Sequence, residues 1–277
     1  MTREMITTTD SAALELFTTG AEFRSNGPGV VVVIGSMVTA ADYSKFSHKL
    51  SAALERPIHT LNRRGHGASS AQAADYTLER DIQDLQVILD HTGATDIFGH
   101  SFGGGLALHA ARTVPVDRLA VYDPAVSVNH SVVAPWIPEY EKATATGDLD
   151  KAAAIAVKGL DAGGAVSRMP LYMLSLASKI TANTPLAKQI REQLPNGVRE
   201  IKALIAADMP AEPFLELPLE TLIMVGEKSP AYFGVACGQI HDVLSGSSYS
   251  VLDGYGHDGV NRAPDKLITE LAEFFAS

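Results

Sequence analysis

The chain has 277 residues, of which 46% are hydrophobic, so it can bury a large core as one domain or as a domain with an insert. Its formal net charge of −10 argues against nucleic acid or an anionic membrane as the main partner, because the net field attracts neither. The single cysteine, Cys237, excludes an internal disulfide, and the polar first ten residues contain no apolar signal core. We therefore expect a cytoplasmic protein without a membrane span.

Short apolar runs alternate with helical patterns through the first half of the chain. Strands are predicted at residues 13–18, 30–34, 57–61, 95–98 and 118–122, and helices at 40–55, 78–91 and 104–112. The run at 30–34 is β-branched with no polar alternation, which is typical of a parallel strand covered by helices on both faces. The run at 13–18 alternates and is predicted to be an edge strand. This succession predicts an α/β fold with a mostly parallel central sheet flanked by helices.

The alternation stops at about residue 127. From there to 213 the periodicity is helical, with candidate helices at 148–160, 169–180, 185–193 and 197–206 and no convincing strand. Strands resume at 221–226 and 248–252, and a final helix is predicted at 263–275. We therefore predict a core made of residues 1–126 and 214–277, and an all-helical insert at 127–213.

The sequence Gly99-His100-Ser101-Phe102-Gly103 lies between a predicted strand and a predicted helix. It matches Gly-x-Ser-x-Gly, the pattern of a nucleophile elbow. A serine on so sharp a turn needs strained backbone angles, and glycine neighbours leave room for it. The turn exposes the Ser101 hydroxyl beside the free N–H groups of a helix N-terminus. The pattern predicts that Ser101 is a nucleophile.

Four motifs in this order resemble the α/β-hydrolase superfamily with a helical cap, over nearly the whole chain. They are the valine-rich strand ending at Gly35-Ser36, the glycine-rich loop at 64–69, the elbow at Ser101, and Gly254-Tyr255-Gly256-His257. The resemblance implies an α/β-hydrolase fold and identifies His257 as the base. A serine hydroxyl is a poor nucleophile until a nearby imidazole takes its proton.

The resemblance leaves two locations for the acid that orients His257. Many relatives carry it after the strand at 221–225, but Ser229 stands at that position. Another location is the end of the strand after the elbow, where this chain has Asp123. We assign the acid to Asp123, with Glu227 as the alternative and Asp258 disfavoured because it adjoins the histidine.

The resemblance also implies an oxyanion hole made of two backbone N–H groups. These belong to Phe102, the residue after the nucleophile, and to Ser36, with its neighbour Met37 as the alternative. Relatives usually have His-Gly before this position, whereas this chain has Ile34-Gly35 and so lacks a hydrogen bond that often braces the loop.

We expect His100, Met37 and Trp136 to contact the substrate, and His66 lies in a loop that the family keeps near the site. The nine histidines show no spacing typical of metal ligands, so no metal and no cofactor are expected. The composition does not set the oligomeric state, and a homodimer is compatible with it.

These residues favour a serine hydrolase that cleaves a carboxylic ester or lactone of a small apolar molecule. Two alternatives remain open. The superfamily also contains lyases, C–C bond hydrolases, cyclases and cofactor-free oxygenases that use the same residues. The same scaffold can also serve as a non-catalytic receptor for a small molecule, since fold does not fix function.

Overall fold

The computed structural model describes residues 1–161, 164–215, 217 and 220–276. An eight-stranded sheet forms its centre, with strand order β1-β2-β4-β3-β5-β6-β7-β8. The strands are β1 (Thr2–Thr7), β2 (Ala13–Thr19), β3 (Val30–Val33), β4 (Ile58–Asn62), β5 (Asp96–His100), β6 (Arg118–Tyr122), β7 (Glu220–Gly226) and β8 (Ser247–Leu252). The β1–β2 and β2–β4 pairs are antiparallel, and the pairs from β4 to β8 are parallel. The predicted fold class is confirmed.

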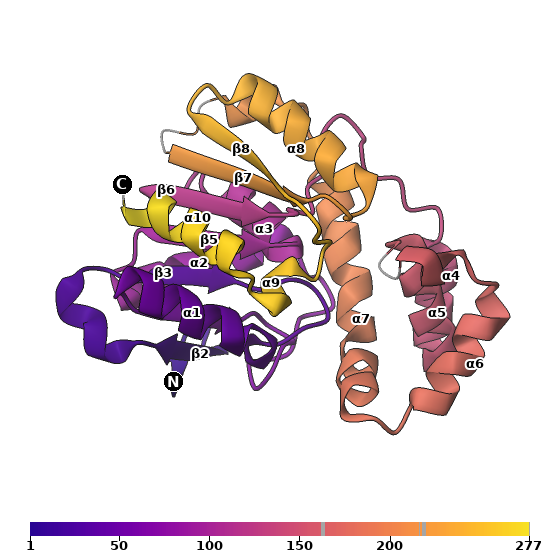
Figure 1. Ribbon diagram of the computed structural model, residues 1–277. Coiled ribbons are helices and arrows are strands. Elements are labelled where there is room, and N and C mark those ends of the chain that lie inside the picture. The colour runs from indigo at the N-terminus through magenta and orange to yellow at the C-terminus, as the bar shows by residue number, and fades with distance from the viewer. Residues whose placement is uncertain (162–163, 216, 218–219, 277) are drawn as a thin grey trace.

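Helices cover both faces of the sheet (Figure 1). They are α1 (Ser44–Leu54), α2 (Leu78–Thr92), α3 (Phe102–Ala110), α8 (Ala231–Val243), α9 (Gly259–Arg262) and α10 (Asp265–Ala276). The valines of β3 are fully buried and alternate between the faces. Val31 and Val33 belong to the core that includes α2, α3 and α8, whereas Val30 and Val32 pack with α1 and α10. Burial on both sides explains the unbroken β-branched run. Cys237 of α8 is fully buried.

The described residues between β6 and β7 include four α-helices, which stand beyond the ends of the strands (Figure 1). They are α4 (Ile137–Ala145), α5 (Leu149–Gly159), α6 (Leu171–Thr181) and α7 (Pro185–Ala206). Their shared core includes Tyr140, Ile155, Leu194 and Val198. Among the described residues of 127–213, the only β pairing is the isolated bridge of Val128 with Met209. We call residues 127–213 the helical insert; its end points remain predictions.

The structure corrects three expectations about the elements. Residues 13–18 do not form an edge strand, because β1 pairs with β2 on its outer side. Helices α4 and α8 were not predicted. The two helices predicted at 185–193 and 197–206 are a single helix, α7, which continues through Pro195. Its buried residues Leu194 and Val198 pack into the core of the insert on either side of the proline, and tertiary packing overrides local propensity there.

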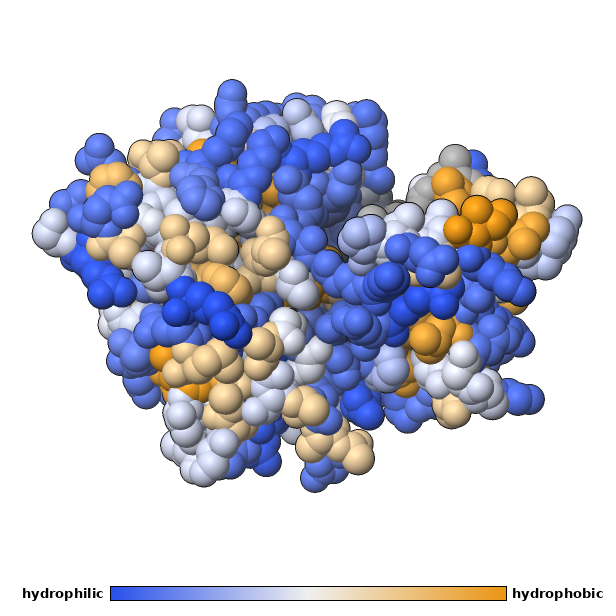
Figure 2. Space-filling model, turned by 90° about the horizontal axis from the view of Figure 1, so that it is seen from below, coloured by the Kyte–Doolittle hydropathy of each residue, from blue (hydrophilic) through white to orange (hydrophobic). Residues whose placement is uncertain are grey.

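The surface in Figure 2 is mainly hydrophilic, with small groups of hydrophobic side chains on both the core and the insert. On α6, the exposed apolar side chains include Tyr172, Leu176 and Ile180. No helix in the described part of the chain is both long and apolar enough to cross a bilayer.

Candidate active site

Ser101 occupies a sharp turn between β5 and α3, with φ 55° and ψ −126°. This combination is unusual for a residue with a side chain and marks local strain. The glycines make the turn possible. A Cβ atom on Gly103 would lie 2.2 Å from the carbonyl oxygen of Val33, and one on Gly99 would lie 2.6 Å from the Cα of Gly104. The backbone of the elbow therefore has the geometry that the motif predicts.

Three side chains from distant parts of the chain form a continuous hydrogen-bonded series. His257 Nε2 lies 3.0 Å from Ser101 Oγ, and His257 Nδ1 lies 3.0 Å from Asp123 Oδ2. Asp123 directly follows β6, and His257 lies in the loop between β8 and α9. Because parallel strands end at the same edge of the sheet, these loops meet above Ser101.

Asp123 is fully buried and each of its oxygens has a donor. The N–H of Gly226 donates to Oδ1 over 3.0 Å, and the hydroxyl of Ser229 donates to Oδ2 over 2.5 Å, beside His257. These bonds satisfy the carboxylate and fix its direction, which a buried charge requires.

The two other carboxylates considered for this position point elsewhere. Glu227 accepts a 2.7 Å hydrogen bond from the N–H of Gly254. Asp258 forms an ion pair of 2.6 Å with Arg262 on the surface. Of these three carboxylates, Asp123 is the one observed to form a hydrogen bond with the His257 imidazole.

The imidazole of His257 lies between two rings. Phe233 of α8 stacks on it at 4.7 Å with an interplanar angle of 12°, and the His100 ring lies at 4.7 Å with an angle of 37°. Phe233 could not be predicted as part of the site, because α8 was not predicted and no motif surrounds this residue. The two rings restrict rotation of the imidazole away from Ser101.

His100 is not among the residues that line the cavity described below, and its expected contact with the substrate remains a prediction. Its Nδ1 lies 2.6 Å from the Tyr43 hydroxyl, and its Nε2 lies 3.1 Å from the carbonyl oxygen of His257. The carbonyl oxygen of His257 can only accept, so Nε2 carries the proton of the neutral ring and the Tyr43 hydroxyl donates to Nδ1. The same hydroxyl accepts a hydrogen bond from the N–H of Gly35. Burial, followed by the nearby His257, lowers the pKa of His100 well below its usual value and keeps the ring neutral.

His66 is also buried away from the cavity. Its Nδ1 lies 2.7 Å from the carbonyl oxygen of Val38, and its Nε2 lies 2.8 Å from Glu200 of α7. Both ring nitrogens therefore have partners within the protein.

The residues expected to form the oxyanion hole lie beside the nucleophile. Phe102 is the first residue of α3, so its N–H has no acceptor within the helix. The loop of Gly35, Ser36 and Met37 follows β3, and a Cβ atom on Gly35 would lie 3.1 Å from the Cβ of Ser101. Met37 has a positive φ of 61°. The Ser36 hydroxyl is buried without a hydrogen-bond partner among the described residues.

A cavity of about 710 Å³ opens at Ser101 and His257. Ser36, Met37 and Trp136 line it too, although their contact with a substrate remains a prediction. The rest of the lining is largely apolar and comes from the insert, including Ala153, Val157, Leu160, Leu174 and Leu194. The site can therefore hold an apolar group of moderate size next to the serine hydroxyl.

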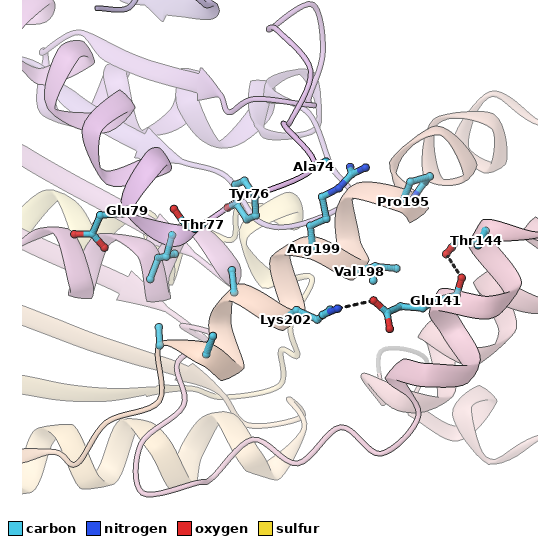
Figure 3. A pocket seen from close by; sticks show the side chains of 15 residues that line it. Ala74, Tyr76, Thr77, Glu79, Glu141, Thr144, Pro195, Val198, Arg199 and Lys202 are labelled. Carbon is cyan, nitrogen blue, oxygen red and sulfur yellow. Dashed lines mark hydrogen bonds and ion pairs between the residues drawn. The ribbon is translucent and has the colours of Figure 1, made fainter. Parts of the chain in front are cut away.

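A second cavity, of about 760 Å³, lies between the segment before α2 and the helices α4 and α7 (Figure 3). Its walls include Tyr76, Glu141, Arg199 and Lys202, and an ion pair of 2.7 Å joins Lys202 to Glu141 across it. Ser101, Asp123 and His257 are absent from its lining, so we place the site in the apolar cavity. The described residues contain no group of three or more His, Cys, Asp or Glu side chains suited to a metal ion.

Comparisons with known proteins agree with this architecture. Lipase LipV of Mycobacterium tuberculosis (strain ATCC 25618 / H37Rv) is 34% identical over 116 residues, which are 40% of this chain and 43% of the lipase. The chain thus aligns with less than half of that relative. An alpha/beta hydrolase from Sphaerobacter thermophilus DSM 20745 superimposes with a TM-score of 0.77 at 25% identity, covering 98% of this chain and all of the other.

The enol-lactonase from Burkholderia xenovorans LB400 has the same fold, with a TM-score of 0.71 at 18% identity, covering 99% of this chain and 100% of the enzyme. The profile of the alpha/beta hydrolase family matches residues 30–270, which include the elbow, Asp123 and His257. The chain belongs to the alpha/beta hydrolase family.

Proposed function

We propose that this protein is a serine hydrolase that cleaves a carboxylic ester or lactone of a small apolar molecule. The observation that carries the proposal is the series Ser101–His257–Asp123, whose hydroxyl end opens into the apolar cavity of about 710 Å³. A hydroxyl, an imidazole and a buried carboxylate in this order are the parts needed for acyl transfer. The matches to a lipase and to the fold of an enol-lactonase support the same reaction class.

In this mechanism, Ser101 Oγ attacks the carbonyl carbon while His257 Nε2 takes the hydroxyl proton. Asp123 holds the His257 tautomer whose Nδ1–H faces the carboxylate and stabilises the imidazolium that forms. The N–H groups of Phe102 and Ser36 donate to the oxyanion of the tetrahedral intermediate. The intermediate collapses as His257 gives its proton to the leaving alkoxide, and Ser101 is left acylated. A water molecule, deprotonated by His257, then releases the acid.

The lining of the cavity indicates the type of substrate. Alanine, valine and leucine side chains from the insert surround the space, so the acyl group or the lactone ring should be apolar.

A panel of p-nitrophenyl esters with increasing acyl length, together with simple lactones, tests the proposal. Wild-type protein should hydrolyse members of the panel and react with a fluorophosphonate probe, and Ser101→Ala should do neither while it remains folded. Hydrolysis in ¹⁸O-labelled water should place one label in the released acid. An intact fold that neither turns over any ester nor reacts with the probe would overturn the proposal, and product without the label would indicate a non-hydrolytic reaction.

A further inference from the structure

Arg63 directly follows β4 and its guanidinium is 1% exposed. Its Nε donates to the carbonyl oxygen of Ile34 over 3.3 Å, and its Nη2 donates to that of Gly35 over 3.1 Å. These two carbonyls immediately precede Ser36, one of the expected oxyanion donors. Arg63 therefore holds this loop without being part of the lining of the apolar cavity.

The same guanidinium contacts the other expected donor. It lies over the ring of Phe102, 4.5 Å from the ring centroid, an arrangement in which cation and ring attract each other. One buried cation thus touches Phe102 and both peptide groups that precede Ser36. A shift of Arg63 would move the two expected oxyanion donors relative to each other.

The sequence around β3 explains the need for such a support. Ile34 stands where relatives usually have a histidine, so the hydrogen bond that often braces this loop is missing. Here Arg63 holds the carbonyls of Ile34 and Gly35, while the Tyr43 hydroxyl accepts from the N–H of Gly35.

A buried guanidinium is strongly unfavourable without opposite charge nearby. Arg63 has two carboxylate partners, both at 2.8 Å: Asp81 of α2 and Glu200 of α7. Glu200 is fully buried. Burial alone would raise the pKa of Glu200, but Arg63 and His66 outweigh it and lower that pKa to about 2, so the carboxylate is charged at neutral pH.

Glu200 belongs to the insert, whereas Arg63 and Asp81 belong to the core. Helix α7 is fixed to the core at two further points, where Asn196 donates to the carbonyl of Gly65 and Gln189 donates to Asp42. Tyr76 donates to Asp81 over 2.7 Å and also lines the second cavity (Figure 3). Arg63 therefore has both of its carboxylate partners when α7 is packed against the core.

We propose that Arg63 is the positioning residue of the oxyanion hole, and that Glu200 makes this positioning depend on the seated insert. The inference rests on the proposed hydrolase function. Arg63 touches neither the serine nor the cavity; it acts through the two peptide segments that carry the donors. Glu200 thus connects α7, which lines the substrate cavity, to Arg63 and through it to the two expected oxyanion donors.

Three variants of the full chain test this: Arg63→Gln, Glu200→Gln and the matched control Arg64→Gln. Arg64 is the next residue, is also buried, and pairs with Asp84 and Asp10 at 2.7–2.9 Å, without an observed contact to Ile34, Gly35 or Phe102. For each variant, kcat and KM are measured with the best p-nitrophenyl ester. Inhibition by a trifluoromethyl ketone, which forms a tetrahedral oxyanion adduct on serine, is compared with inhibition by the product acid. Thermal unfolding reports the folded state.

For Arg63→Gln we expect kcat to fall on the order of 10²-fold, the loss typical of one missing oxyanion donor, with KM within about threefold of wild type. Affinity for the trifluoromethyl ketone should fall by the same factor, and affinity for the product acid should stay constant. Glu200→Gln should lower kcat and ketone affinity together by about tenfold, because part of the counter-charge is lost. Arg64→Gln should destabilise the fold yet retain wild-type kcat.

A folded Arg63→Gln variant with wild-type kcat, or an Arg64→Gln variant with an equal loss, would overturn the role of Arg63. Wild-type kcat and ketone affinity in Glu200→Gln would overturn the role of the insert. If Arg63→Gln does not fold, Arg63→Lys is tested in its place. The lysine keeps the positive charge but cannot donate to both carbonyl oxygens in the same way, so kcat should still fall. An unchanged kcat in this variant would refute the role of Arg63. An inactive wild-type chain overturns the proposed function and this inference together, whereas an active wild type with unaffected variants overturns this inference alone.

Discussion

The Ser229 hydroxyl donates a 2.5 Å hydrogen bond to Asp123 Oδ2, the oxygen that also faces His257 Nδ1. Ser229 stands at the chain position where many relatives carry the acid of the triad. The two acid locations of the superfamily therefore meet in space here, one occupied by a carboxylate and the other by a hydroxyl that supports it. A carboxylate at the end of either β6 or β7 could therefore lie beside the His257 imidazole.

Replacing Asp123 with asparagine should lower kcat about 10⁴-fold if Asp123 is the acid, as in the serine proteases, because the amide favours the wrong histidine tautomer. The fold should persist, since Asn has the shape of Asp and can still accept from the N–H of Gly226. Steady-state kinetics with a p-nitrophenyl ester measures the loss. Glu227→Gln is the matched control, and a large loss there with a small one at Asp123 would move the acid to Glu227.

The contact between Asp123 and Ser229 also predicts that the acid can be exchanged between the two positions. Asp123→Ser alone should be nearly inactive, and adding Ser229→Asp should recover at least tenfold in kcat, since the new carboxylate lies on the same side of His257. Ser229→Asp in the wild-type background should not raise kcat, because two adjacent carboxylates, one fully buried and one half-buried, would then repel each other. A double variant no more active than Asp123→Ser would show that the exchange fails.

Trp136 should limit the length of the acyl group. Its indole lines the cavity and rests on Gly159 of α5, where a Cβ atom would lie 2.2 Å from the ring. Trp136→Ala should enlarge the cavity and raise kcat/KM for long-chain esters relative to short ones by about tenfold. Gly159→Ala should push the indole into the cavity and shift the preference towards short esters. The ratio of kcat/KM across the ester panel reports both changes, and an unchanged ratio in both variants would place the acyl group elsewhere.

Folding stability should decrease as the pH falls from 6.5 towards 4. Burial lowers the pKa of both His59 and His109 to about 4, and it lowers that of His100 as well. Histidines that are neutral when folded take up protons on unfolding below pH 6.5, so their stabilising effect is complete above 6.5 and is lost as the pH approaches the folded pKa. Each contributes up to about 1.4 kcal/mol of unfolding free energy per pH unit in this window.

Urea unfolding at pH 5.0, 5.5, 6.0 and 7.0 measures this dependence. His109→Gln removes one of the three groups and should reduce the slope by up to about 1.4 kcal/mol per pH unit. A slope near zero between pH 5 and 6.5 in the wild type would contradict the buried neutral state of these rings.

The sequence was sufficient to predict that Ser101, Asp123 and His257 come together in the fold. Ser101 lies in a Gly-x-Ser-x-Gly pattern between a predicted strand and a predicted helix, and Asp123 stands at the end of a strand, where α/β sheets place their sites. His257 follows in the order typical of the superfamily. Strand alternation then brings these loops to one edge of the sheet.

Other features lack a local signal. In β1, only Ile6 is buried, so no apolar alternation reveals the strand. The stacking of Phe233 on His257 and the pairing of Arg63 with Glu200 join residues far apart in the chain, and each follows from the assembled core rather than from a motif. The direction of the His100 side chain could not be predicted from the sequence, because it depends on a hydrogen bond with Tyr43, which lies 57 positions earlier in the chain.

The insert leaves the sheet after β6 and returns at β7, and these two strands are hydrogen-bonded neighbours. An evolutionary exchange of residues 127–213 would therefore leave every strand pair intact while it replaced most of the walls around the substrate. An exchange that kept Arg63 buried would need a new insert with an acidic side chain at the place of Glu200, because Glu200 pairs with Arg63 at 2.8 Å. Diversification of specificity should thus preserve one buried acid while the residues around it vary.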